Sequence, residues 1–166
     1  MMVFDPQAMK TLLGQQSFWA DVPEPVLEAL AAVSVVRDFP AGSTIFREGA
    51  ENHFLYVLHR GRVGLDMHVV GCGRVRILSL GPGEMLAWSA LLGDGRMTAT
   101  ATALEDTQVI STAGAHLLEL CHTSDAFGSQ LMARVAEVLA QRLLATRLQL
   151  LDLFSPSAMS GSMDGS

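Results

Sequence analysis

The sequence is poor in positive charge. Eleven lysines and arginines stand against seventeen aspartates and glutamates, and Lys10 is the only lysine. Surfaces that bind nucleic acids usually carry clustered basic residues, so this balance disfavours DNA as a partner. The sequence also lacks an apolar run of the roughly 20 residues that a membrane helix needs. Its start, MMVFDPQ, lacks the basic residues and apolar core of a signal peptide. We therefore expect a soluble, cytoplasmic protein that binds neither DNA nor a membrane.

Residues that bind metals or perform catalysis are also sparse. The two cysteines, Cys72 and Cys121, match no metal-binding spacing, and in a chain without an export signal such thiols are usually reduced. The five histidines are scattered and form no HxH pair. Neither a Ser/His/Asp nor a Cys/His set has motif context, and the chain shows no paired carboxylates at a candidate site. We expect no metal, no cofactor and no catalytic residue, and therefore no enzyme.

The 166 residues change in pattern twice along the chain. Residues 1–32 read as two short helices, Pro6–Leu13 and Pro25–Ala32, with prolines at their entrances. Residues 33–112 read as short strands, because ten of the fifteen glycines fall there and punctuate them. Residues 113–154 read as helix again. A length near the common domain size predicts a single domain over residues 1–154.

Within the strand region the clearest element is a hairpin that pairs Arg62–Val70 with Gly73–Leu80. Apolar and polar residues alternate along both strands, which predicts one buried and one wet face. The segment Val70-Gly-Cys-Gly is its expected turn.

The C-terminal region predicts two helices. Ser111 or Thr112 could cap a helix over Ala113–Cys121, and Ser124 could cap a long helix that reaches about Phe154. The long helix has apolar residues in alternating steps of four and three, the seam spacing of a coiled coil. We expect it to form a homodimer, although one wide face buried in a monomer would explain the same pattern. The expected dimer residues are Met132, Leu139, Leu143, Leu150 and Leu153. The small polar tail, residues 155–166, is expected to be disordered.

One stretch has the composition of an anion site: Gly83–Ala103, GEMLAWSALLGDGRMTATATA. It runs from a glycine-rich turn through a short apolar helical segment to Arg96 and a strand of threonine and alanine. Small residues let a backbone approach a ligand closely, and N–H groups at a helix start attract anions, especially beside a cation. We call this stretch the cassette.

The motif FPAGSTIFREGAENHFLYVLHRGRV at Phe39–Val63, together with the cassette, resembles the cyclic nucleotide-binding domain family. The resemblance covers nearly the whole globular part of the chain. It implies a mainly β fold with flanking helices: an eight-stranded jelly-roll β-barrel over residues 33–112, N-terminal helices over 1–32 and a long C-terminal dimerisation helix within 113–154. In the family the cassette reads roughly F-G-E-x-A-L-L, then R-x-A-T. Its glutamate accepts the ribose hydroxyl and its arginine pairs with the cyclic phosphate.

The cassette of this chain departs from the family at the residues that hold the nucleotide. Ala87 replaces the glycine and Trp88 the glutamate, and an indole cannot accept a hydrogen bond. With the following strand in register, Met97 takes the place of the arginine, and Arg96 stands one residue earlier. On a strand that shift turns the side chain to the opposite face, unless a bulge after Gly95 restores its aim. Cyclic AMP or cyclic GMP is therefore a doubtful ligand. The candidate binding residues are Gly83, Ala87, Trp88, Ser89, Ala90, Arg96, Met97, Thr98 and Ala99.

Two functions remain open. The pattern W-S-A-L with R-M-T-A-T-A resembles a variant in single-domain relatives, which favours a rebuilt pocket for another small anion or an aromatic ligand. Trp88 could equally be core packing in a filled pocket. Regulators of the family carry a helix-turn-helix after the long helix, and here about twelve small polar residues follow Phe154. The sequence predicts either a stand-alone, homodimeric sensor module or a ligand-free module that binds another protein.

Overall fold

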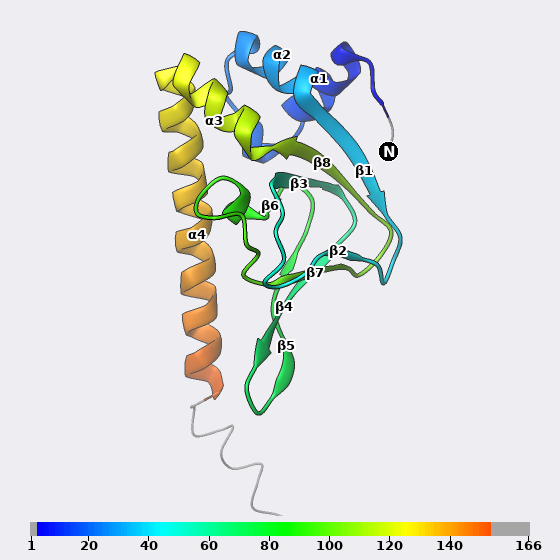
Figure 1. Cartoon of the computed structure of the whole chain (residues 1–166), viewed down its shortest axis with the longest axis vertical. Coiled ribbons are helices and arrows are strands. Elements are labelled where there is room, and N and C mark those ends of the chain that lie inside the picture. The colour runs from blue at the N-terminus through cyan, green and yellow to red at the C-terminus, as the bar shows by residue number, and fades with distance from the viewer. Residues whose placement is uncertain (1–2, 154–166) are drawn as a thin grey trace, which may run out of the picture. The chain divides into compact units, whose positions relative to one another are not determined.

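The computed structural model describes residues 3–153, which form four α-helices, two short 3₁₀ turns and eight β-strands (Figure 1). The helices are α1 (Pro6–Gly14), α2 (Glu24–Val33), α3 (Gly114–Thr123) and α4 (Asp125–Leu153), and the 3₁₀ turns are η1 (Ser17–Trp19) and η2 (Trp88–Ala90). The strands are β1 (Ser34–Phe39), β2 (Thr44–Phe46), β3 (Phe54–Arg60), β4 (Val63–Val69), β5 (Gly73–Leu80), β6 (Met85–Leu86), β7 (Thr100–Ala103) and β8 (Thr107–Ala113).

The strands pair in two antiparallel sheets of four, in the orders β1-β8-β3-β6 and β2-β7-β4-β5. Eight strands were expected, and the jelly roll expected over residues 33–112 takes the form of these two sheets, without a closed barrel among the described residues. The strands β2 and β6 have only three and two residues, and both lie at sheet edges, where they end the hydrogen-bonded ladders. Apolar residues of both sheets, such as Leu58 and Val109 from one and Val63 and Leu65 from the other, form a single buried cluster. We call the space between the sheets the sandwich interior.

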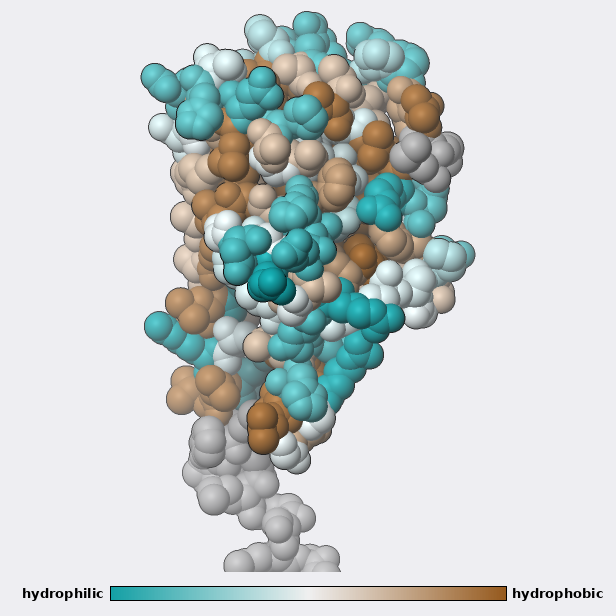
Figure 2. Space-filling model, viewed as in Figure 1, coloured by the Kyte–Doolittle hydropathy of each residue, from teal (hydrophilic) through white to brown (hydrophobic). Residues whose placement is uncertain are grey.

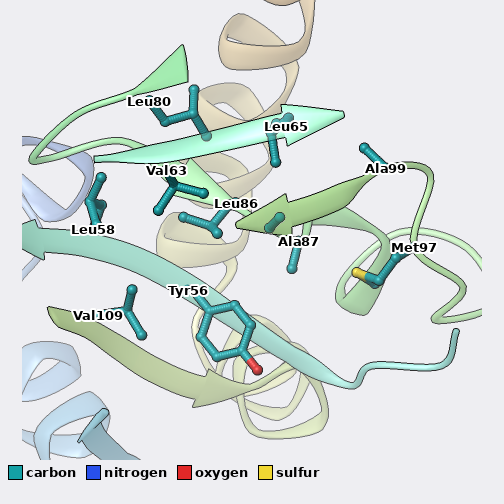
Figure 3. Close-up of a cluster of buried hydrophobic side chains, with 11 residues drawn as sticks. Tyr56, Leu58, Val63, Leu65, Leu80, Leu86, Ala87, Met97, Ala99 and Val109 are labelled. Atoms are coloured by element: carbon teal, nitrogen blue, oxygen red, sulfur yellow. The ribbon is translucent and has the colours of Figure 1, made fainter. Parts of the chain in front are cut away.

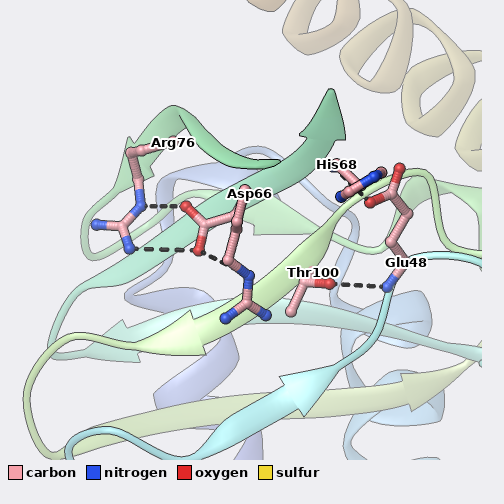
Figure 4. Close-up of polar contacts among 6 residues, drawn as sticks. Glu48, Asp66, His68, Arg76 and Thr100 are labelled. Carbon is pink, nitrogen blue, oxygen red and sulfur yellow. Dashed lines mark hydrogen bonds and ion pairs between the residues drawn. The ribbon is translucent and has the colours of Figure 1, made fainter. Parts of the chain in front are cut away.

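The expected hairpin of β4 and β5 forms, with Val63 opposite Leu80 and Val69 opposite Gly73. A register shift between Leu65 and Asp66 interrupts the predicted alternation, so that Asp66 is buried while Met67 and Val69 are exposed. The hairpin carries a polar cluster (Figure 4). The buried Asp66 carboxylate accepts from Arg76 Nε at 2.5 Å, and Arg74 Nε lies 3.8 Å away. This bond raises the pKa of the Arg76 guanidinium. The pair of Asp66 with Arg76 favours this register of the hairpin, because a slip by one residue would turn the two side chains to opposite faces.

The helix caps agree with the sequence at Ser124 and differ at Ser111 and Thr112. Ser124 Oγ accepts from the Phe127 amide at 3.3 Å, directly before α4. Ser111 and Thr112 are buried inside β8, and α3 begins at Gly114. The ladder between β3 and β8 continues to Ala113, and this strand pairing overrides the local capping preference of a serine or threonine.

The described chain divides within α4 into two compact units, one ending at Leu131 and one beginning at Met132. In the second unit Met132 and Leu139 are half-buried, while five leucines are 54–67% exposed: Leu143, Leu144, Leu148, Leu150 and Leu151. Hydrophobic residues are visible along this helix at the left of Figure 2. The side chain of Leu153 and the tail 155–166 lie outside the described part of the chain. No helix within residues 3–153 is both long and apolar enough to span a membrane.

Candidate functional site

The cassette begins with a tight turn after β5. Gly83 has φ +88°, its N–H donates to Leu58 O at 2.7 Å, and an added Cβ would lie 2.7 Å from Ser17 Oγ. After β6 comes Ala87, at φ +68° and ψ +43°, which places it in the left-handed region before η2. Glycine adopts this conformation freely, whereas an alanine Cβ collides with the backbone. Ala87 therefore adopts a backbone conformation that glycine would favour, and its side chain makes this conformation strained.

This strain predicts that substituting Ala87 with glycine costs less stability than the same substitution at another buried alanine. Ala87 and Ala99 are both 6% exposed and belong to the same apolar cluster, but only Ala87 has a positive φ. Ala87→Gly loses a buried methyl group and relieves a conformation that costs about 1–2 kcal/mol, whereas Ala99→Gly only loses the methyl group. We expect Ala99→Gly to lower the free energy of unfolding by about 1–2 kcal/mol more than Ala87→Gly. Urea denaturation of both variants measures the difference, and equal losses would contradict the strain.

Arg96 and Met97 point in opposite directions. Met97 is 3% exposed and belongs to the buried cluster with Ala87, Ala99 and Tyr56. Figure 3 shows its side chain directed inward, toward Ala87. The Arg96 side chain is 59% exposed, donates from Nη1 to Gly49 O at 3.2 Å and lies 3.6 Å from Glu51 Oε1. The 93–95 loop does not turn Arg96 inward: Asp94 Oδ1 accepts from the Arg96 amide at 3.0 Å, and Arg96 pairs with Glu51 in an isolated β-bridge.

A polar chain crosses the sandwich interior beside Met97. Asn52 Nδ2 lies 3.7 Å from Met97 Sδ, Tyr56 Oη donates to Asn52 Oδ1 at 3.1 Å, and Arg37 Nη1 donates to Tyr56 Oη at 3.2 Å. Burial raises the pKa of Tyr56, and the neighbouring Arg37 opposes that shift. Tyr56 is therefore a neutral phenol at physiological pH. Arg37 brings a cation into the interior from β1, on the sheet opposite β7.

The N–H groups that were expected to receive an anion are partly used within the cassette. The Ala90 amide donates to Ala87 O at 3.0 Å, and Ser89 O accepts from the Gly95 amide at 3.1 Å. The 3₁₀ turn of the cassette, η2, is also packed tightly against the start of α3. A Cβ added to Gly114 would lie 2.1 Å from Ala90 O, so only glycine permits this approach. The cassette and the first residue of α3 are therefore in close backbone contact.

The nine candidate residues differ in burial. Ala87, Met97 and Ala99 gather in the sandwich interior, and Ser89 is buried as well. Arg96 and Thr98 are exposed, and Gly83, Trp88 and Ala90 are half-buried. Among residues 3–153, no three His, Cys, Asp or Glu side chains come together in a way that could hold a metal ion.

Comparison with known proteins identifies the family to which the two sheets and the cassette belong. Residues 36–124, more than half of the chain, match the cyclic nucleotide-binding domain. The chain belongs to the cyclic nucleotide-binding domain family. It is 34% identical over 143 residues to the cyclic AMP receptor protein of Thermus thermophilus, covering 86% of this chain and 63% of that protein. The chain therefore spans less than two thirds of that relative's length.

Two further relatives show the range of the family. A putative cyclic nucleotide-binding protein of Geobacter metallireducens is 28% identical in its crystal structure, with a TM-score of 0.70 over 84% of this chain and 98% of that one. Glutaminase 2 of Bradyrhizobium diazoefficiens is 29% identical over 86% of this chain, which covers 22% of that protein. Domains similar to this chain thus occur in proteins that are named for different functions.

The residues that sequence reasoning missed are Arg37, Tyr56 and Ser111, which bring polar groups into the interior of this family member. A signal for Arg37 was present, since Val35, Arg37 and Phe39 alternate and so share one face of β1. The signal for Ser111 was hidden, because a serine shortly before a helix is typical of a cap.

Proposed function

We propose that this chain is a regulatory module, without catalysis, whose cassette does not hold a cyclic nucleotide in the manner of its family. The observation that carries the proposal is the position of Met97. An apolar side chain fills the buried place where the family resemblance puts an arginine, beside Ala87 and Ala99. A cyclic phosphate there would bring a negative charge into an apolar cluster without a cation from the cassette, and burying an unpaired charge is costly.

The exposed Arg96 does not compensate for this loss. Its guanidinium already interacts with Gly49 O and Glu51, and Nε lies 4.0 Å from Asp94 Oδ2. To reach the interior it would have to leave these acceptors and exchange faces with Met97. Trp88 also supplies no acceptor for a ribose hydroxyl, because an indole only donates. These two departures favour a filled cassette over a nucleotide sensor.

We further propose that the module acts as a homodimer through α4. Five leucines on the described part of this helix are more than half exposed, and contiguous apolar surface of this kind marks an interaction site. Leu143 and Leu150 are seven residues apart, the repeat of a coiled-coil seam. Contact with another protein, the alternative use of these leucines, would leave the chain monomeric by itself.

A thermal-shift titration with cyclic AMP and cyclic GMP tests the cassette. A ligand at about 100 times its dissociation constant adds about 2.7 kcal/mol to the free energy of unfolding, which moves the melting temperature by several degrees. We expect no change in melting temperature for this chain. The Thermus relative, named as a cyclic AMP receptor, serves as the positive control. A saturable rise with either nucleotide would contradict the proposal.

A further inference from the structure

A hollow of about 520 Å³ opens at the edge of the first sheet, and none of the cassette residues lines it. It is lined by Val35, Arg37, Asp38, Phe54 and Ser111. Val35 is directly opposite Ser111 in the pairing of β1 with β8, and Ser111 is opposite Tyr56 on β3. Paired residues project from the same face, so these side chains share the face that carries Tyr56 toward the sandwich interior. The volume lies within the range of small-molecule sites.

The cation of this hollow is Arg37, and it lacks an acidic partner. Its Nη1 donates to Tyr56 Oη at 3.2 Å, and its Cζ lies 5.2 Å from the centre of the Phe39 ring and 6.0 Å from that of Tyr56. No carboxylate within residues 3–153 forms an ion pair with it. A guanidinium has five N–H donors in a rigid fork that matches the oxygens of a carboxylate or phosphate. The two aromatic rings hold this fork in place, which reduces the entropy lost on binding.

The second polar group is Ser111, which is 1% exposed and lines the same hollow. Its Oγ has no hydrogen-bond partner among the described residues. Nearby Ser34, also buried, has its hydroxyl 2.7 Å from Thr112 Oγ1. Buried polar side chains nearly always have a partner, so an unpaired hydroxyl in the same hollow as a guanidinium without a carboxylate partner indicates a missing acceptor.

We propose that this hollow, the Arg37–Ser111 pocket, binds a small organic anion. The oxygens of its acidic group accept hydrogen bonds from the Arg37 guanidinium and the Ser111 hydroxyl, and its apolar body lies against Val35 and Phe54. The carboxylate of Asp38, which accepts from Gln108 Nε2 at 2.9 Å, also lines the pocket and repels additional negative charge. A singly charged carboxylate therefore fits better than a doubly charged phosphate. The proposal does not depend on what the cassette binds.

Titration followed by amide NMR tests the site, with benzoate, phenylphosphate and the uncharged benzyl alcohol as probes. We expect benzoate to shift the amides of Val35, Phe54 and Ser111 saturably, phenylphosphate to bind more weakly, and benzyl alcohol to leave them unchanged. Arg37→Gln should weaken benzoate at least about ten-fold, since a hydrogen bond to a charged group is lost. Arg47→Gln removes the same charge at an exposed position outside the pocket and should leave the affinity unchanged.

A pair of serine variants distinguishes a binding role from a structural one. Ser111→Ala removes an unpaired hydroxyl, so without ligand its melting temperature should equal or exceed that of the wild type, while benzoate binds more weakly. Ser34→Ala breaks the bond to Thr112 and should lower the melting temperature. The comparison of these two serine variants remains informative even if Arg37→Gln does not fold.

Three results would overturn the proposal that the Arg37–Ser111 pocket binds a small organic anion. One is that neither benzoate nor phenylphosphate shifts these amides at about 1 mM, the weak end of specific affinity. Another is that Ser111→Ala lowers the melting temperature as much as Ser34→Ala does. The third is that the shifts fall on residues 87–99 instead. Cyclic nucleotide binding at those cassette residues would contradict the proposed function and leave the Arg37–Ser111 pocket standing, so the two failures can be told apart.

Discussion

Met97→Arg is expected to lower the free energy of unfolding by about 3–5 kcal/mol, the cost of leaving a buried charge without a partner. Met97 is almost fully buried among apolar residues, and the longer guanidinium would also overpack them. Arg96→Met, one residue away, removes exposed ion pairs and should cost less than about 1 kcal/mol. Urea denaturation of the two variants measures both values, and similar costs would show that position 97 can reach solvent.

The substitution at position 97 also tests whether the residues at positions 88 and 97 are what prevents nucleotide binding. Trp88→Glu combined with Met97→Arg restores the two family residues that hold the ribose and the cyclic phosphate. We expect this double variant to be less stable than the wild type without ligand and to regain stability with cyclic AMP, because the phosphate then pairs with the buried guanidinium. A double variant that cyclic AMP does not stabilise would show that the rest of the pocket is closed as well.

Leu143→Glu with Leu150→Glu is expected to convert a dimer into a monomer. Both leucines are more than half exposed on the described helix, and burying a leucine fully contributes about 1.5–3 kcal/mol. In the proposed symmetric dimer four such side chains would meet, and four carboxylates in their place would repel one another. Light scattering gives the mass of each variant, while circular dichroism verifies that the helix remains.

The control for this experiment is Gln141→Glu with Gln149→Glu, which adds the same charges at two exposed polar positions of α4. It should remain dimeric. If the leucine variant keeps the mass of two chains, the interface lies elsewhere. If the wild type is itself a monomer, the exposed leucines serve a different partner.

Much of the site could be predicted because its signals are local. The alternation of side chains along an extended chain predicted opposite faces for Arg96 and Met97 unless a bulge intervened. The structure decides between these alternatives, with Arg96 outside and Met97 inside. The cap at Ser124 depends on a contact only three residues long. The pairing of β4 with β5 needs only a short turn between two neighbouring strands. In each case the residues that decide the outcome are close together in the sequence.

The remaining features depend on partners far along the chain. Ser111 belongs to a strand rather than a cap because β1 and β3, more than 50 residues earlier, pair with β8 on both sides. Ala87 is held at a positive φ by the cassette fold around it, against its own preference. Arg37 became a candidate only when Tyr56 and Ser111 were brought beside it. The sequence by itself determined the family, because the motifs that carry the resemblance are local, and that resemblance implied eight strands. The sequence left open whether Arg96 faces inward or outward. Only the tertiary structure decided that the strands form two sheets and which polar groups their interior contains, because long-range pairing sets both.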